Sequence, residues 1–160
     1  MATNTKWAAP TAVQTLMQTA LDGLANNTLV VSSETGGNMT SGAYDNSSAL
    51  DLYADFELAI CYATAPSAGT RIAELYLLPS ADGTNYASLD GSNQPQKALL
   101  IAVFESRNPS TSAVERLLVP GVSLPPGKFK LVLKNTSGQA FKDNSVTKTL
   151  KMRPYQLQNV

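Results

Sequence analysis

Residues 122–135, VSLPPGKFKLVLKN, constrain the fold of this chain more than any other segment. Their Pro-Pro-Gly triplet is a strong turn signal. The residues after it alternate between an apolar and a basic set, Phe129, Leu131 and Leu133 against Lys128, Lys130 and Lys134. A period of two is expected of a strand with one buried face. The segment therefore predicts a β-sandwich, and it contains no pattern typical of catalysis.

The composition limits the partners that we expect. The 160 residues suit one domain, and twelve basic residues balance twelve acidic ones. A neutral surface does not gather nucleic acid, and it gives little repulsion between copies. No apolar run has membrane-spanning length, residues 1–10 lack a signal-peptide pattern, and the single cysteine, Cys61, excludes an internal disulfide. We expect synthesis in a cytoplasm, a homo-oligomer, and neither a nucleic-acid nor a membrane partner.

Short apolar segments separated by Gly-, Pro- and Asn-rich loops recur along the chain. They predict seven or eight strands, at 13–17, 28–33, 50–64, 71–79, 97–107, 112–119, 128–135 and 148–155. This count and spacing predict an all-β fold with little helix, an antiparallel two-sheet β-sandwich of jelly-roll type.

The domain boundaries follow from the same segments. We expect a single sandwich domain at 11–155, an N-terminal arm at 1–10 and a polar C-terminal tail at 156–160. Segment 11–24 is ambiguous, because apolar residues at helical spacing compete with β-branched threonines, and we expect a short strand followed by a helical turn at 20–26. Residues 34–48 have the composition of a flexible loop.

Two turns and a proline delimit the later strands. We expect Pro120-Gly121 to close the strand before it and Pro154 to break the last strand. Asp82-Gly83 predicts a tight turn in the loop at 80–96. The segment resembles a calcium-binding loop only superficially, because it lacks the Asp-x-Asp-x-Asp-Gly spacing and the distal glutamate.

Segment 50–64 has the longest alternation in the sequence. We expect one set to face the core: Leu52, Ala54, Phe56, Leu58, Ile60 and Tyr62. The other set should face outward: Asp51, Tyr53, Asp55, Glu57, Ala59 and Cys61.

Segment 71–79 differs because both of its faces are apolar. Ile72, Tyr76 and Leu78 lie on one face, and Ala73, Leu75 and Leu77 on the other. A single sandwich has one interior, so the second face needs another cover, either the N-terminal segment or another subunit. We take Leu75 and Leu77 as candidate interface residues.

Trp7 is the third candidate interface residue and the only tryptophan of the chain. It either covers one end of its own core or anchors the arm on a neighbouring subunit, since tryptophan is favoured at binding hot spots. In both cases we expect a pocket for its ring, because a disordered arm would expose a large apolar surface to water.

Residue types that support catalysis are scarce. The histidine count is zero, which together with a lone cysteine excludes the usual zinc site. Asp51, Asp55 and Glu57 share a predicted strand face, and two carboxylates can hydrolyse glycosides, but no second motif supports that chemistry. Cys61 is a packed small residue or a reactive thiol, and we favour packing. We therefore expect no enzyme activity, no catalytic residues, no metal and no cofactor.

Tyrosines offer one further possibility, a platform for sugar rings. Aromatic faces stack on sugars, but the candidates are scattered over the sequence: Tyr44, Tyr53, Tyr76, Tyr86 and Tyr155. Scattered tyrosines are more typical of core and sheet packing.

Three stretches resemble one family: LDLYADFELAI at 50–60, AELYLLPSADGTNYASL at 73–89, and VSLPPGKFKLVLKNTSGQAF with TLKMRPY at 122–155. They resemble small structural proteins of tailed bacteriophages from the head or capsid-decoration gene region. LPPGKFKLVLKN with KMRPY is the most specific part, and the resemblance covers most of the chain from Leu24 onward.

The resemblance implies a β-sandwich virion component on the capsid surface, a decoration or cement protein that binds and stabilises the shell of major capsid protein. It favours a trimer over a dimer, because cement proteins often occupy local threefold positions. It carries over no active site. The alternative is a carbohydrate-binding or tail-associated sandwich module, since one fold supports both roles.

Overall fold

The computed structural model describes residues 5–86, 98–143 and 147–159, and strands dominate this part of the chain. They are β1 (Thr5–Trp7), β2 (Gln14–Met17), β3 (Leu29–Val31), β4 (Met39–Thr40), β5 (Ala43–Asp45), β6 (Tyr53–Ile60), β7 (Arg71–Pro79), β8 (Leu99–Glu105), β9 (Glu115–Ser123), β10 (Lys128–Asn135), β11 (Thr149–Tyr155) and β12 (Leu157–Asn159). A 3₁₀ helix, η1 (Thr19–Leu21), stands where the sequence predicts a helical turn at 20–26. No helix in these ranges is long and apolar enough to cross a membrane.

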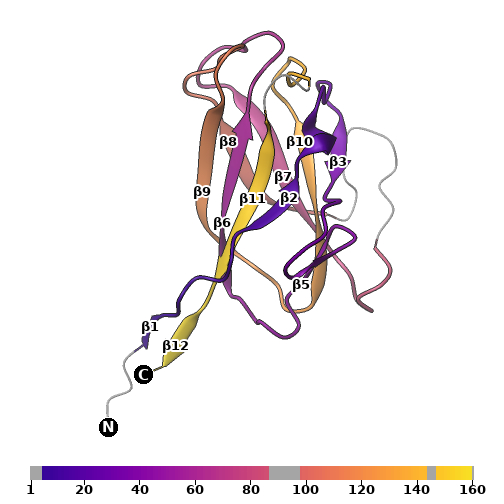
Figure 1. Ribbon diagram of the computed structural model, residues 1–160, viewed down its shortest axis with the longest axis vertical. Helices are drawn as coiled ribbons and strands as arrows, with labels where there is room; N and C mark the ends of the chain where they lie inside the picture. The colour runs from indigo at the N-terminus through magenta and orange to yellow at the C-terminus, as the bar shows by residue number, and fades with distance from the viewer. Residues whose placement is uncertain (1–4, 87–97, 144–146, 160) are drawn as a thin grey trace.

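The strands form two antiparallel sheets that pack face to face (Figure 1). One sheet has the order β2-β11-β6-β9, and the other has the order β4-β5-β10-β7-β8, with β3 also pairing with β10. The connections from β6 to β7, β8 to β9, β9 to β10 and β10 to β11 each cross from one sheet to the other, which is the winding of a jelly roll. The predicted fold class is therefore confirmed.

The strand that organised the sequence argument lies at the centre of its sheet. β10 pairs with β3, β5 and β7. Its predicted inward residues Phe129, Leu131 and Leu133 are at most 1% exposed, as expected. They meet the inner face of the other sheet, where Phe56, Leu58, Leu150 and Met152 belong to the same core.

At the start of segment 50–64, the inward and outward positions are the reverse of the predicted alternation. Asp51, expected outside, is 2% exposed, whereas Leu52, expected in the core, is 48% exposed. Asp51 accepts hydrogen bonds from the Tyr44 hydroxyl at 2.8 Å and from Thr11 Oγ1 at 3.2 Å. The inward assignments from Ala54 to Tyr62 are confirmed, because the four of them on β6 and Tyr62 are fully buried.

Several predicted boundaries are wrong. β9 does not close at Pro120-Gly121 but runs on to Ser123, with a register shift opposite residues 54–56. Gly121 has a φ of 71°, as a bulge accommodates. The expected flexible loop at 34–48 contains the β4–β5 hairpin.

The described parts of the arm and the tail pair with each other. β1 pairs with β12, and Trp7 lies directly opposite Leu157. Pro154 does not break β11, since this strand continues to Tyr155 and β12 follows it. The Pro154 carbonyl accepts a hydrogen bond from the Thr11 N–H at 3.0 Å. The two strands form a ribbon that projects from the sandwich (Figure 1). We call β1 with β12 the terminal ribbon.

Candidate binding face

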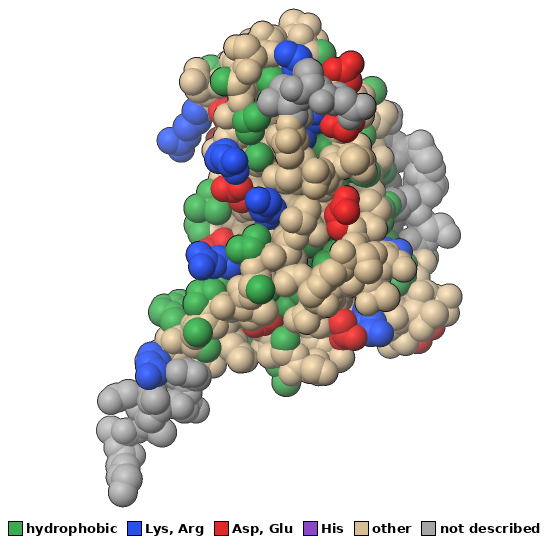
Figure 2. Space-filling model, in the orientation of Figure 1, with side chains coloured by type: hydrophobic (Ala, Val, Ile, Leu, Met, Phe, Trp, Pro, Cys, Tyr) green, Lys and Arg blue, Asp and Glu red, His purple; other side chains and the backbone are tan. Residues whose placement is uncertain are grey.

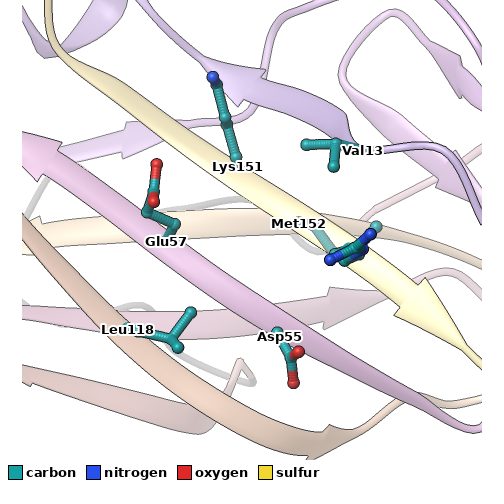
Figure 3. Close-up of a pocket in the computed structure, with 7 residues that line it drawn as sticks. Val13, Asp55, Glu57, Leu118, Lys151 and Met152 are labelled. Atoms are coloured by element: carbon teal, nitrogen blue, oxygen red, sulfur yellow. The ribbon is translucent and has the colours of Figure 1, made fainter. Parts of the chain in front are cut away.

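The outer face of the β2-β11-β6-β9 sheet gathers charged and apolar side chains. An open hollow of about 330 Å³ lies on it (Figure 3). The side chains that line it come from all four strands or their ends: Val13, Lys151, Arg153, Asp55, Glu57 and Leu118. Met152 also borders the hollow, but its side chain is fully buried in the core on the other side of the sheet. We call this surface the outer face.

Charged side chains on the outer face form two rows in register. Lys151 lies directly opposite Glu57, and Arg153 directly opposite Asp55, so β11 carries a basic row and β6 an acidic row. Glu57 also forms an ion pair with Arg116 of β9, with 2.7 Å between Oε1 and Nη1. Figure 2 shows basic, acidic and hydrophobic side chains side by side over these strands.

The acidic row has partners within its own chain, and the basic row has fewer. Asp55 Oδ1 accepts hydrogen bonds from the Gly121 N–H at 3.0 Å and from the Tyr155 hydroxyl at 3.2 Å. Among the residues that the structure describes, neither Lys151 nor Arg153 makes an ion pair within 4.0 Å. The basic row is therefore available to acidic groups from outside the chain.

Two apolar side chains flank the rows. Val13, just before β2, is 53% exposed, and Leu118 of β9 is 64% exposed. Large apolar side chains this exposed, on either side of charged rows, are typical of a contact surface.

An aromatic cluster joins the outer face to the terminal ribbon. The Trp7 ring stands edge-on to Tyr155, with centroids 5.2 Å apart, and to Tyr53 at 5.9 Å. Tyr53 and Tyr155 lie opposite each other on β6 and β11, with their rings stacked at 5.9 Å. Burial, and then the charge of Asp55, raise the pKa of Tyr155 above its ordinary value.

Trp7 has ring contacts on its own chain but no enclosing pocket. It remains 60% exposed, and the hydrophobic core between the sheets includes neither Trp7 nor the two tyrosines. The ring therefore does not cover an end of the core, and most of its surface is free for a partner.

The other two candidate interface residues lie elsewhere. Leu75 and Leu77 are 0% and 3% exposed and belong to the core, so they are not available to another subunit in this fold. The two residues predicted at an interface lie on the face of β7 that points into the core. On the opposite face Leu78 is buried as well, at 3% exposure. Part of the loop expected at 80–96 lies outside the described residues.

The remaining sequence candidates have structural roles. Cys61, expected on the outward set, is fully buried, and its Sγ donates to the Ser110 carbonyl at 3.3 Å. Asp82 is confirmed in a turn, where it accepts the Thr84 and Asn85 N–H groups, and these donors hold the pKa of its carboxyl well below the usual range. Within the described ranges, no three His, Cys, Asp or Glu side chains gather to hold a metal ion.

The outer face thus offers packing, charge pairing and aromatic contact, which are the means of binding a partner. Sequence analysis placed Tyr53, Asp55 and Glu57 outward but missed that Lys151 and Arg153 lie beside them. No protein-family model and no curated protein matches the sequence.

Proposed function

We propose that this protein is a bacteriophage virion structural protein, a decoration or cement protein that binds the major capsid protein and stabilises its shell. The observation that carries the proposal is the terminal ribbon. Trp7 and Leu157 lie on one face of it, since they are directly opposite, and they are 60% and 38% exposed. A projecting two-stranded ribbon has no core of its own, and such ribbons are marginally stable alone in water.

The resemblance supports the same function. Its three stretches fall on β6, on β7 with the loop after it, and on the segment from the end of β9 to β11. These strands form the centre of both sheets, so the resemblance concerns the framework of the sandwich. The ribbon and the outer face are then the parts that provide binding.

The mechanism of stabilisation is burial of apolar surface at the joints of the shell. Covering the exposed part of Trp7 removes about 150 Å² from water, which contributes at most about 4 kcal/mol before the cost of association. Repeated at each copy over the shell, contributions of this size would resist the pressure of packaged DNA.

The proposal includes a place and an assembly. The protein is made in the host cytoplasm and ends on the outer surface of the capsid. It acts as a homo-oligomer, and the resemblance favours a trimer over a dimer. Its binding partner is the major capsid protein.

The test uses virions purified from the phage that carries this coding sequence. Mass spectrometry should find the protein in many copies per particle, and antibody labelling should place it on the head. Particles lacking it should lose DNA at a lower temperature than complete ones. Absence from virions refutes the proposal, and a few copies on the tail refute the capsid location.

The aromatic cluster favours a second candidate, a carbohydrate-binding or tail-associated module. Sugar rings stack on free aromatic faces. Here Tyr53 and Tyr155 stack on each other and Trp7 stands edge-on to both, so an extended flat platform is not formed. Binding on a glycan array that is lost in Trp7→Ala would support this function. A blank array together with labelling of the head would favour capsid decoration.

A further inference from the structure

We propose that the outer face of the β2-β11-β6-β9 sheet is the contact surface between two copies of this chain, related by a two-fold axis. The inference stands on the register of charges across that face. It does not depend on where the protein functions, and it predicts a pair in place of the trimer that the resemblance favours.

The side chains of the face change character from one strand to the next. Among the side chains that line the hollow, the order from the β2 edge to the β9 edge is apolar, basic, acidic and apolar: Val13, then Lys151 and Arg153, then Glu57 and Asp55, then Leu118. Arg116 of β9 is outside this set and is paired with Glu57 of its own chain. Figure 3 shows the labelled ones among them, with Val13 just before β2, Lys151 on β11, Glu57 and Asp55 on β6, and Leu118 on β9. This order is self-complementary, because reversing it exchanges basic with acidic and apolar with apolar.

A two-fold axis parallel to the strands and between β11 and β6 performs that reversal. It lays β11 of one copy over β6 of the second copy. Since Lys151 lies directly opposite Glu57, and Arg153 directly opposite Asp55, each basic side chain then meets an acidic one at the same height along the strand. Two-fold symmetry makes every such contact twice, as in an isologous interface.

The same two-fold axis also brings the apolar and aromatic side chains of the two copies together. It lays the β2 edge over the β9 edge, so Val13 and Leu118, 53% and 64% exposed, come to the same side of the contact. It also brings Tyr155 over Tyr53 of the second copy, because these residues are directly opposite on β11 and β6. The two terminal ribbons then project from the same end of the pair.

The contact supplies what one copy lacks. In the described part of one chain, Lys151 and Arg153 have no acidic group within 4.0 Å. A second copy provides one for each. The zero net charge of the chain adds no general repulsion between copies.

The size of the face sets the strength that we expect. Strands β11, β6 and β9 are at least seven residues long and β2 has four. With a strand spacing of about 4.8 Å, the face covers roughly 400 Å² on each copy, or about 800 Å² counted over both copies. Interfaces of that size are weak, so the pair should form at micromolar to tens of micromolar concentration. Its charge contacts should weaken as salt is added.

The experiment measures molar mass by light scattering and sedimentation equilibrium up to 200 µM, on the full chain and on three variants. Glu57→Lys and Lys151→Glu each place like charges across the two-fold axis. Lys134→Glu is the matched control, because it reverses a lysine that lies opposite Glu74 on the other sheet. Melting temperatures verify that each variant is folded.

The proposal predicts a dimer for the wild type and for Lys134→Glu. Each outer-face variant alone should raise the dimer dissociation constant by about 100-fold, as expected for two attractive contacts turned repulsive. An equimolar mixture of the two variants should dimerise again, because positions 57 and 151 are both basic in one variant and both acidic in the other, so each meets an opposite charge across the axis. This restoration separates charge contact from loss of fold.

Four results overturn the inference. They are a wild-type monomer at 200 µM, a trimer, a dimer whose dissociation constant neither outer-face variant changes, and a mixture that stays monomeric. A monomer or a trimer would leave the outer face to a partner other than a second copy. None of these results bears on whether the protein is found in virions.

Discussion

Replacing Tyr44 by phenylalanine removes a single hydroxyl from a side chain that is 1% exposed. We expect Tyr44→Phe to lower the free energy of unfolding by about 2 kcal/mol, because hydrogen bonds to charged groups contribute roughly 1.5–3 kcal/mol. The hydroxyl donates to Asp51 Oδ2 at 2.8 Å, and Asp51 is itself only 2% exposed. Without that donor the buried carboxylate keeps the Thr11 hydroxyl at 3.2 Å.

The chain offers a matched control in Tyr62, which is 0% exposed. Within the described residues, the buried Tyr62 hydroxyl makes no hydrogen bond of normal geometry, although the polar side chains of Ser106 and Glu115 lie near it. Tyr62→Phe removes the same atom, yet it relieves an unsatisfied polar group instead of breaking a bond. We expect a change within about 0.5 kcal/mol, or a gain of up to about 1 kcal/mol.

Urea unfolding followed by fluorescence compares both variants with the wild type at pH 7. The midpoints give the free energies if the slopes agree. For a chain of this size, a loss of 2 kcal/mol lowers the melting temperature by about 4–8 °C. Equal losses in the two variants would refute the reasoning, because packing alone would then account for both.

The same hydroxyls predict how stability responds to alkaline pH. Burial raises the pKa of both Tyr44 and Tyr62 above the ordinary value of 10.0. A group whose pKa is raised by folding contributes stability below its unfolded pKa and loses it as pH rises further. Urea midpoints should therefore stay level to about pH 9.5 and fall steadily above pH 10. A level profile up to pH 12 would contradict the burial of these hydroxyls.

Two further pairs of variants test local features by urea unfolding. Gly42 has a φ of +76°, and an added Cβ would lie 1.7 Å from the Ser32 carbonyl oxygen, so Gly42→Ala should unfold or displace the β5 edge. Gly138→Ala, with a φ of +79° and open space around it, should cost only the strain of about 1–2 kcal/mol. Lys148→Met breaks an ion pair whose lysine is 0% exposed and should cost about 3–5 kcal/mol. Arg116→Met breaks a pair whose arginine is 63% exposed and should cost less than about 1 kcal/mol. Equal costs within either pair would contradict these expectations.

Local alternation made the sandwich predictable, and local backbone geometry limited the prediction. β10 was placed correctly because every residue from Lys128 to Asn135 keeps the extended backbone on which a period of two depends. Before β6 that condition fails, since Leu50 has a φ of +51°. The Asp51 N–H donates to Asn46 Oδ1 at 2.8 Å, which holds the turn and rotates Asp51 inward. A bend of this kind leaves no trace in the polarity pattern.

The outer face required information that no single segment contains. Alternation alone assigned Asp55 and Glu57 to the outside. Their position beside Arg153 and Lys151 depends on the register between two strands that are almost one hundred residues apart. Trp7 meets Leu157 across nearly the whole chain.

The choice of face on β7 was undetermined for a different reason. Both of its faces are largely apolar and carry buried residues, as Leu75 and Leu78 show, although Glu74 and Tyr76 on the second face are half-buried. Hydrophobicity therefore gave no sign to distinguish the inward face from the outward one, and only the topology of the sheets separates them.

Deleting residues 1–9 tests whether the terminal ribbon binds a partner or supports the sandwich. The deletion removes β1 and Trp7, whose ring is 60% exposed and lies outside the core. Because little burial is lost, the melting temperature should fall by less than about 4 °C, the shift that 1 kcal/mol causes in a chain of this size. The dimer should persist, since the charged rows of the outer face remain. Binding to capsids stripped of the protein should be lost, and Trp7→Ala should weaken it in the same direction. A large fall in melting temperature would show that the ribbon supports its own sandwich, and loss of the dimer would show that the ribbon, rather than the charged rows, joins the two copies.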